Sequence, residues 1–61
     1  MPAPKDKPLD FAVGDRVRQL KYGVGLVTEI RAAGADYEVT VQFDAAGVKK
    51  LMAHLSRLVR V

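Results

Sequence analysis

Tyr37-Glu38-Val39-Thr40-Val41-Gln42-Phe43 is the stretch of this chain with the clearest periodicity. Apolar and polar residues alternate strictly along it, so four large apolar side chains point to one side and three polar side chains to the other. Such alternation predicts a strand with one buried face. A sheet therefore organises the fold, and partner strands are expected before and after this stretch.

On the N-terminal side, turn residues separate two further apolar segments. Val13-Gly14-Asp15 predicts a turn, residues 16–20 predict a first strand, and residues 26–31 predict a second. A hairpin loop is expected over residues 32–36, a length that usually carries a glycine in the left-handed region. Short strands with frequent turn residues are typical of an all-β fold.

Two irregularities are expected in the second strand. Gly23 and Gly25 stand one residue apart, which indicates a positive φ or a close approach of two backbones. Val27 and Ile30 do not share the period of two, so a β-bulge is expected between them.

On the C-terminal side, residues 44–47 predict a turn and residues 48–52 a fourth strand. Residues 53–57 lack turn residues and suit one helical turn, and residues 58–61 suit a short fifth strand. An alternative is a single amphipathic helix over residues 48–59, whose apolar residues also fit the i, i+3, i+4 spacing. The final strand is preferred because a small barrel needs it to cover an open sheet edge.

The length of the chain limits the architecture. Its 61 residues make one domain with a thin core, and five short strands are too few for a two-sheet sandwich. A small, strongly bent barrel remains. We expect it over residues 11–61, capped by Phe11, and we expect residues 1–10, with three prolines and alternating charges, to be a flexible leader.

The composition argues against an enzyme. His54 and Ser56 are the only residues of their types, and at a spacing of two on one helical turn their side chains diverge. One histidine, no cysteine and scattered carboxylates give no metal-ligand set. Gly23-Val24-Gly25 lacks the third glycine and the helix of a dinucleotide loop. We therefore expect no catalysis, metal, cofactor or small-molecule substrate.

Charge and hydropathy limit the classes of partner that the chain is expected to bind. The net charge of +3 favours acidic partners, either a nucleic-acid backbone or an acidic protein surface. No apolar run approaches the roughly 20 residues that span a bilayer, and the N-terminus has no apolar signal region. Together with the absence of cysteine, this predicts a cytoplasmic location and no membrane partner.

A family resemblance is carried by four elements in a fixed order. They are Val13-Gly14-Asp15-Arg16-Val17-Arg18, then Lys21-Tyr22-Gly23-Val24-Gly25-Leu26-Val27, then residues 39–43, and then Gly47-Val48-Lys49-Lys50-Leu51 with a closing Leu58. Over residues 11–61 the chain resembles the C-terminal Tudor-like domain of the UvrD/PcrA class of DNA helicases. It is more distantly similar to the polymerase-interacting domains of CarD and of the transcription–repair coupling factor.

The resemblance implies an SH3-like, Tudor-type barrel that docks on RNA polymerase and links a repair helicase to transcription. Gln19 departs from the pattern, because these families often have histidine there. The 61 residues contain no G-x-x-x-x-G-K-[ST] loop of a helicase motor. The chain is therefore either a domain of a longer helicase or a stand-alone relative.

The residues expected at the partner-binding surface are basic or flank an aromatic ring. Arg16 and Arg18 share a strand face, whereas Lys49 and Lys50 point to opposite faces. Tyr22 and Leu26 are expected to be exposed in the middle of a basic stripe. The predicted set is Arg16, Arg18, Lys21, Tyr22, Leu26, Lys49 and Lys50.

Two functions use this surface. The first is docking on RNA polymerase, in which an exposed strand edge offers a second binding mode through backbone hydrogen bonds. The alternative is a small nucleic-acid-binding barrel that contacts DNA or RNA weakly through the same basic residues.

Overall fold

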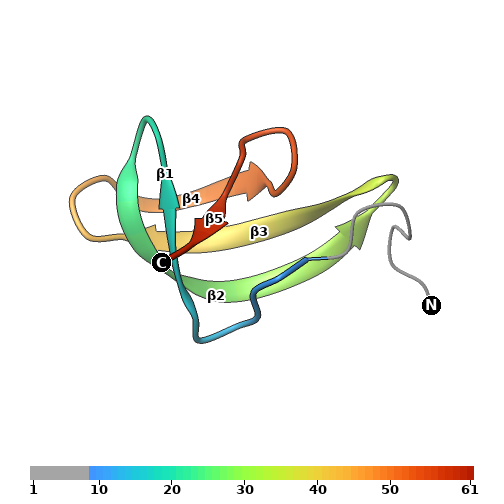
Figure 1. Ribbon diagram of the computed structural model, residues 1–61, viewed down its shortest axis with the longest axis horizontal. Helices are drawn as coiled ribbons and strands as arrows, with labels where there is room; N and C mark the ends of the chain where they lie inside the picture. Colours follow the sequence, from blue (N-terminus) through green and yellow to red (C-terminus); the bar gives the residue numbers. More distant parts are fainter. Residues whose placement is uncertain (1–8) are drawn as a thin grey trace.

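The computed structural model describes residues 9–61 and contains one antiparallel sheet in the order β4-β3-β2-β1-β5 (Figure 1). The strands are β1 (Arg16–Gln19), β2 (Gly23–Ala33), β3 (Asp36–Phe43), β4 (Gly47–Met52) and β5 (Val59–Arg60). The all-β, five-stranded prediction is confirmed. Of the expected leader, residues 1–8 lie outside the described residues.

Strand β3 occupies the position that its alternation predicts. Val39, Val41 and Phe43 are buried, and Tyr37 is half-buried on the same side. β3 pairs with β2 along one edge and with β4 along the other. The strand that is clearest in the sequence is therefore the centre of the longest ladders.

Strand β2 is longer than predicted and strongly bent. It begins at Gly23, because the segment after the turn already pairs with β1. Its register against β3 shifts between Val27 and Glu29, which confirms the expected bulge. β2 pairs with β1 over residues 23–26 and with β3 over residues 25–33. Because β2 bends, β1 and β5 cross over the layer of β3 and β4 (Figure 1).

The two glycines of the Gly-x-Gly element have different roles. Gly23 has a φ of 86°, which side chains other than glycine rarely adopt. Gly25 is extended and buried, and a Cβ atom there would lie 2.6 Å from Val41 Cγ1 and 2.8 Å from the Cα of Phe43. β2 and β3 therefore approach closely at the bend only because position 25 has no side chain.

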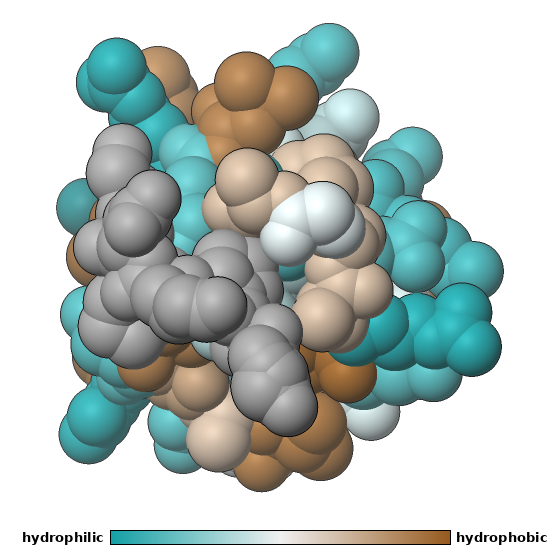
Figure 2. Space-filling model, turned by 90° about the vertical axis from the view of Figure 1, so that its right-hand side faces the viewer, coloured by the Kyte–Doolittle hydropathy of each residue, from teal (hydrophilic) through white to brown (hydrophobic). Residues whose placement is uncertain are grey.

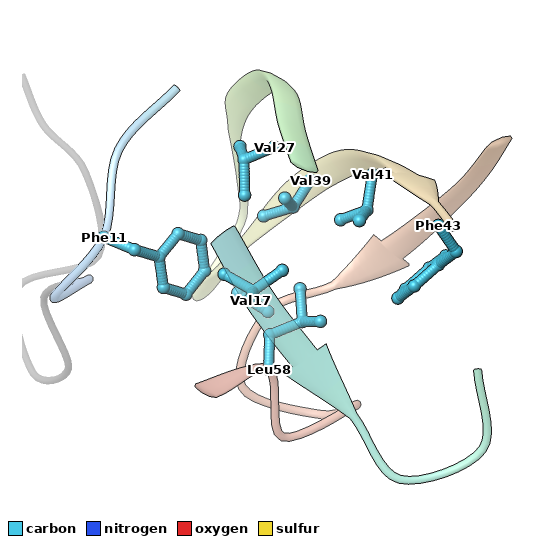
Figure 3. Close-up of a cluster of buried hydrophobic side chains, with 8 residues drawn as sticks. Phe11, Val17, Val27, Val39, Val41, Phe43 and Leu58 are labelled. Atoms are coloured by element: carbon cyan, nitrogen blue, oxygen red, sulfur yellow. The ribbon is translucent and has the colours of Figure 1, made fainter. Parts of the chain in front are cut away.

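The core lies between the two halves of the bent sheet. Figure 3 shows Val17 and Leu58 facing Val27, Val39 and Val41 across this space, with Phe11 closing one end. Phe11 is 8% exposed, which confirms its expected role as a cap. Leu9 is half-buried and packs against the same core.

The β2–β3 hairpin is tighter than expected. Ala33 pairs with Asp36, so the loop is the two residues Gly34 and Ala35 and not the five-residue loop expected over residues 32–36. Gly34 has a φ of 63°, as expected for the glycine of this loop. A glycine with positive φ in first position is suited to a two-residue hairpin, so the strands continue closer to the turn.

Residues 53–57 form a hydrogen-bonded turn, and the alternative of a helix over residues 48–59 is wrong. The turn ends like a helix, because the Leu58 N–H donates to the Ala53 carbonyl at 3.1 Å and the Arg57 N–H to the His54 carbonyl at 3.2 Å. Arg57 has a φ of 58°, in the position that glycine usually takes in such a Schellman ending. The predicted helical turn is thus present as a single hydrogen-bonded turn, and it does not extend into a helix.

Asp36 holds this turn against the β2–β3 hairpin. Its carboxylate accepts hydrogen bonds from the backbone N–H groups of Tyr37 at 2.7 Å, His54 at 2.9 Å and Leu55 at 3.2 Å. Burial raises the pKa of Asp36, but these three hydrogen bonds and the nearby His54 lower it below its ordinary value of 3.8 overall. The ionised carboxylate thus acts as a cap for the start of the turn.

The sheet is left open on one side. β4 and β5 are its two edges, and no backbone ladder joins them within residues 9–61.

In the part of the chain that the structure describes, no helix is long and apolar enough to span a membrane. Figure 2 shows one end of the molecule, where hydrophobic residues reach the surface at several places among hydrophilic ones.

Candidate interaction surfaces

The seven residues predicted at the partner surface do not form one stripe. Strand register divides them, because directly paired residues of antiparallel strands lie on the same face. Lys49 pairs with the buried Val41 and therefore lies on the inner side of the sheet. Lys50 pairs with Thr40 and lies on the outer side, which confirms that the two adjacent lysines point to opposite faces.

Tyr22 is the centre of the first group, which we call the Tyr22 cluster: Lys21, Tyr22 and Lys49. The Tyr22 ring packs on Phe43 with 5.3 Å between ring centroids. The Nζ atoms of Lys21 and Lys49 lie 5.5 and 5.4 Å from the centre of the Tyr22 ring, within the range of cation–π attraction. Two ammonium groups are thus gathered around one ring.

The Tyr22 ring is less accessible than the sequence suggested. Tyr22 is half-buried and not exposed, because the turn between β1 and β2 folds the ring onto Phe43. Gln19 fixes this turn: its Oε1 accepts hydrogen bonds from the backbone N–H groups of Lys21 at 2.7 Å and Tyr22 at 3.0 Å. The residue that departs from the family pattern therefore positions the cluster.

The other four predicted residues, Arg16, Arg18, Leu26 and Lys50, lie on the outer side of the bent sheet, Lys50 on β4 and the two arginines on β1. Arg16 and Arg18 flank the buried Val17, which confirms that they share a face. Leu26 pairs directly with Arg16 and is half-buried and not exposed. Leu26 is therefore less accessible than predicted.

Arg16 is committed to an ion pair within the chain. Its Nη2 atom lies 2.6 Å from Oδ2 of Asp44, and both side chains are about half exposed. An exposed pair of this kind contributes about 0–1 kcal/mol, so a partner can displace it at little cost. Asp44 was not among the predicted residues, and no local signal indicates a partner 28 residues away in the sequence.

The free edge of β4 offers backbone groups beside the Tyr22 cluster. The Ala53 N–H donates to the Tyr37 carbonyl at 2.8 Å, which fixes the alternation of hydrogen-bonded pairs along the β3–β4 ladder. By that alternation the backbone groups of Val48 and Lys50 point away from β3. A partner strand therefore has an edge to pair with, between an apolar and a basic side chain.

The chemistry-bearing residues elsewhere are spread apart. The His54 ring meets the Tyr37 ring edge-on, with 6.1 Å between centroids, and the Ser56 carbonyl accepts a hydrogen bond from Gln19 Nε2 at 3.3 Å. Within residues 9–61 no group of three histidine or acidic side chains is placed to hold a metal ion.

The bent five-stranded sheet, the Phe11 cap and the closing strand define a small Tudor-type β-barrel. The family model for the PcrA/UvrD tudor domain matches residues 13–57. The chain belongs to this family.

Two curated proteins are similar over most of the chain. It is 31% identical to "DNA helicase II" of Haemophilus influenzae over 52 residues, and this aligned region covers 85% of the chain. It is 35% identical over 51 residues to "ATP-dependent DNA helicase PcrA" of Leuconostoc citreum, which covers 84% of the chain. The matched region is 7% of each helicase, so the similarity concerns an accessory domain and not the motor.

Proposed function

We propose that this chain is a non-catalytic interaction module that docks on RNA polymerase in the context of helicase-linked DNA repair or transcription. Two lines of support meet here. The family is that of the tudor domain of PcrA/UvrD helicases, and the sequence has a more distant resemblance to the polymerase-interacting domains of CarD and of the transcription–repair coupling factor. The sequence prediction of a cytoplasmic location agrees with such a partner.

The Tyr22 cluster is the observation that carries the proposal. A ring held in place by Phe43, with ammonium groups 5.4 and 5.5 Å from its centre, is a preorganised aromatic and cationic contact. Aromatic and basic side chains in fixed positions are typical of interface hot spots. The free edge of β4 lies next to it and adds backbone hydrogen bonds to the docking mode.

A binding titration with purified RNA polymerase tests the proposal. The double variant Lys21→Gln/Lys49→Gln removes both charges of the cluster and keeps most of the side-chain volume. We expect it to weaken polymerase binding by about tenfold, which corresponds to about 1.4 kcal/mol. Arg31→Gln is the matched control, because Arg31 lies on an exposed part of β2 and its ion pair is with Glu29, 3.6 Å from Nε to Oε2. Equal affinities for the double variant and the control would contradict the proposal.

Direct nucleic-acid binding is the second candidate. Arg18, Lys50 and Arg60 are exposed and form no ion pair within residues 9–61, and the net charge is +3. Binding of labelled DNA would then weaken with salt, with a log–log slope of about −0.9 for each phosphate neutralised. DNA binding with that slope and no binding to polymerase would favour this candidate over the first.

A further inference from the structure

A groove lies between the β1–β2 turn and the turn that precedes β5. Its volume is about 370 Å³, and its lining residues are Arg18, Gln19, Leu20, Gly23, Arg57 and Val59. Of these, only Arg18 belongs to the residues predicted at the partner surface. The groove is thus a separate feature from the Tyr22 cluster.

The two walls of the groove are fixed to each other. Gln19 Nε2 donates to the Ser56 carbonyl at 3.3 Å, while Gln19 Oε1 accepts from the N–H groups of the β1–β2 turn. At the base, Arg18 of β1 pairs with Val59 of β5. The groove is therefore formed before any partner arrives, which lowers the entropy that binding would lose.

The lining combines unpaired positive charge with exposed aliphatic surface. Neither Arg18 nor Arg57 forms an ion pair or a side-chain hydrogen bond within residues 9–61, and no carboxylate lines the groove. Leu20 is 99% exposed and Val59 is 54% exposed. A leucine so fully exposed gains apolar contact only when another surface covers it.

We propose that this groove binds an acidic and aliphatic segment of a protein partner, with carboxylates on Arg18 and Arg57 and an aliphatic side chain against Leu20 and Val59. The inference rests on the proposed function in that the chain is taken as an interaction module, and it names the chemistry of the bound segment. Guanidinium groups hold carboxylates in two-point contacts. Nucleic acid fits less well, because no aromatic ring lines the groove for bases to stack on.

Arg57 allows binding to be separated from folding. Its backbone has a φ of 58°, a conformation in which glycine is less strained than any other residue. The variant Arg57→Gly therefore removes the guanidinium from the groove while it leaves the fold at least as stable. A loss of binding in this variant has its cause in the lost side chain.

The test is fluorescence anisotropy of a labelled ten-residue peptide of alternating glutamate and leucine, titrated with the whole chain. We expect saturable binding that Arg57→Gly, Arg18→Gln and Leu20→Ser each weaken by about threefold or more. The control variant Arg31→Gln leaves the affinity unchanged. Control peptides with lysine for glutamate, or with serine for leucine, bind at least about threefold more weakly.

Three results would overturn the inference: no saturable binding of the peptide, equal weakening by Arg31→Gln and Arg57→Gly, or tighter binding of an oligothymidine through Arg18 and Arg57. The proposed function fails in a different experiment. If the chain does not bind polymerase but binds the peptide through Arg57, the groove stands and the polymerase assignment falls. If polymerase binding persists unchanged in both Arg57→Gly and Leu20→Ser, the polymerase assignment stands and the groove is not the site that binds polymerase.

Discussion

Gly25 is the position where we expect the addition of one methyl group to lower the free energy of unfolding the most. In Gly25→Ala the new Cβ atom would lie 2.6 Å from Val41 Cγ1, 2.8 Å from the Gln42 carbonyl oxygen and 2.8 Å from the Cα of Phe43. Two of these three atoms belong to the backbone of β3, so a side-chain rotation cannot relieve the overlap. The strands must separate at the bend, where β2 also pairs with β1.

The cost follows from the contacts. Overpacking contributes about 1–3 kcal/mol, and weakening two hydrogen bonds of the β2–β3 ladder adds about 1–3 kcal/mol. A domain of 61 residues has a total free energy of unfolding of about 3–9 kcal/mol. We therefore expect Gly25→Ala to be largely unfolded, or to lose at least about 3 kcal/mol.

Urea denaturation, followed by circular dichroism and by the fluorescence of the two tyrosines, measures this loss. Gly34→Ala is the matched control, because Gly34 also has a special conformation, with φ 63°, but nothing lies within 4 Å of its Cβ position. Its expected cost is about 1–2 kcal/mol from backbone strain alone. If Gly25→Ala is no less stable than Gly34→Ala, the close approach of β2 and β3 is not a constraint on the fold.

Three further predictions concern the charged residues. Asp36→Asn should lower the free energy of unfolding by about 1–2 kcal/mol, because the charged cap of the turn is lost. In the wild type this stabilisation is full above pH 3.8, the ordinary pKa, and is lost as the pH falls through the lower pKa of folded Asp36. Urea denaturation at a series of pH values should therefore show this loss of stability in the wild type and not in the variant. Arg57→Gly should raise stability by about 0.5–1 kcal/mol in urea denaturation, and a decrease would contradict the strain at φ 58°. A double-mutant cycle on Arg16 and Asp44 should give a coupling of less than about 1 kcal/mol, and a larger value would mean that this exposed pair is structural.

Much of the fold is predictable from local patterns. The alternation of residues 37–43 identifies β3 and its buried side, because period two is a property of the strand itself. The phase change between Val27 and Ile30 indicates the bulge for the same reason, and the register shift between Val27 and Glu29 confirms it. The sequence of the Gly-x-Gly element is compatible with a positive φ or with a close approach of two backbones. In the structure Gly23 has the positive φ and Gly25 lies at the close approach.

The features that local patterns do not indicate depend on contacts between distant segments. Tyr22 looked exposed, but its exposure depends on Phe43, which is 21 residues later and reaches it only after the sheet bends. The period of two already predicts opposite faces for Lys49 and Lys50, but only the pairing of Lys49 with the buried Val41 shows that Lys49 is the one on the inner side. The groove needs both the Gln19–Ser56 hydrogen bond and the pairing of Arg18 with Val59, and neither leaves a pattern in the sequence.

The central claim, that this barrel docks on RNA polymerase, is tested most directly by titrating the labelled chain with purified polymerase, free of nucleic acid, at about 0.15 M salt, where long-range attraction between exposed charges is largely screened. We predict saturable binding with a dissociation constant no weaker than tens of micromolar, reduced in Lys21→Gln/Lys49→Gln and unchanged in Arg31→Gln. The absence of binding at tens of micromolar would contradict the account.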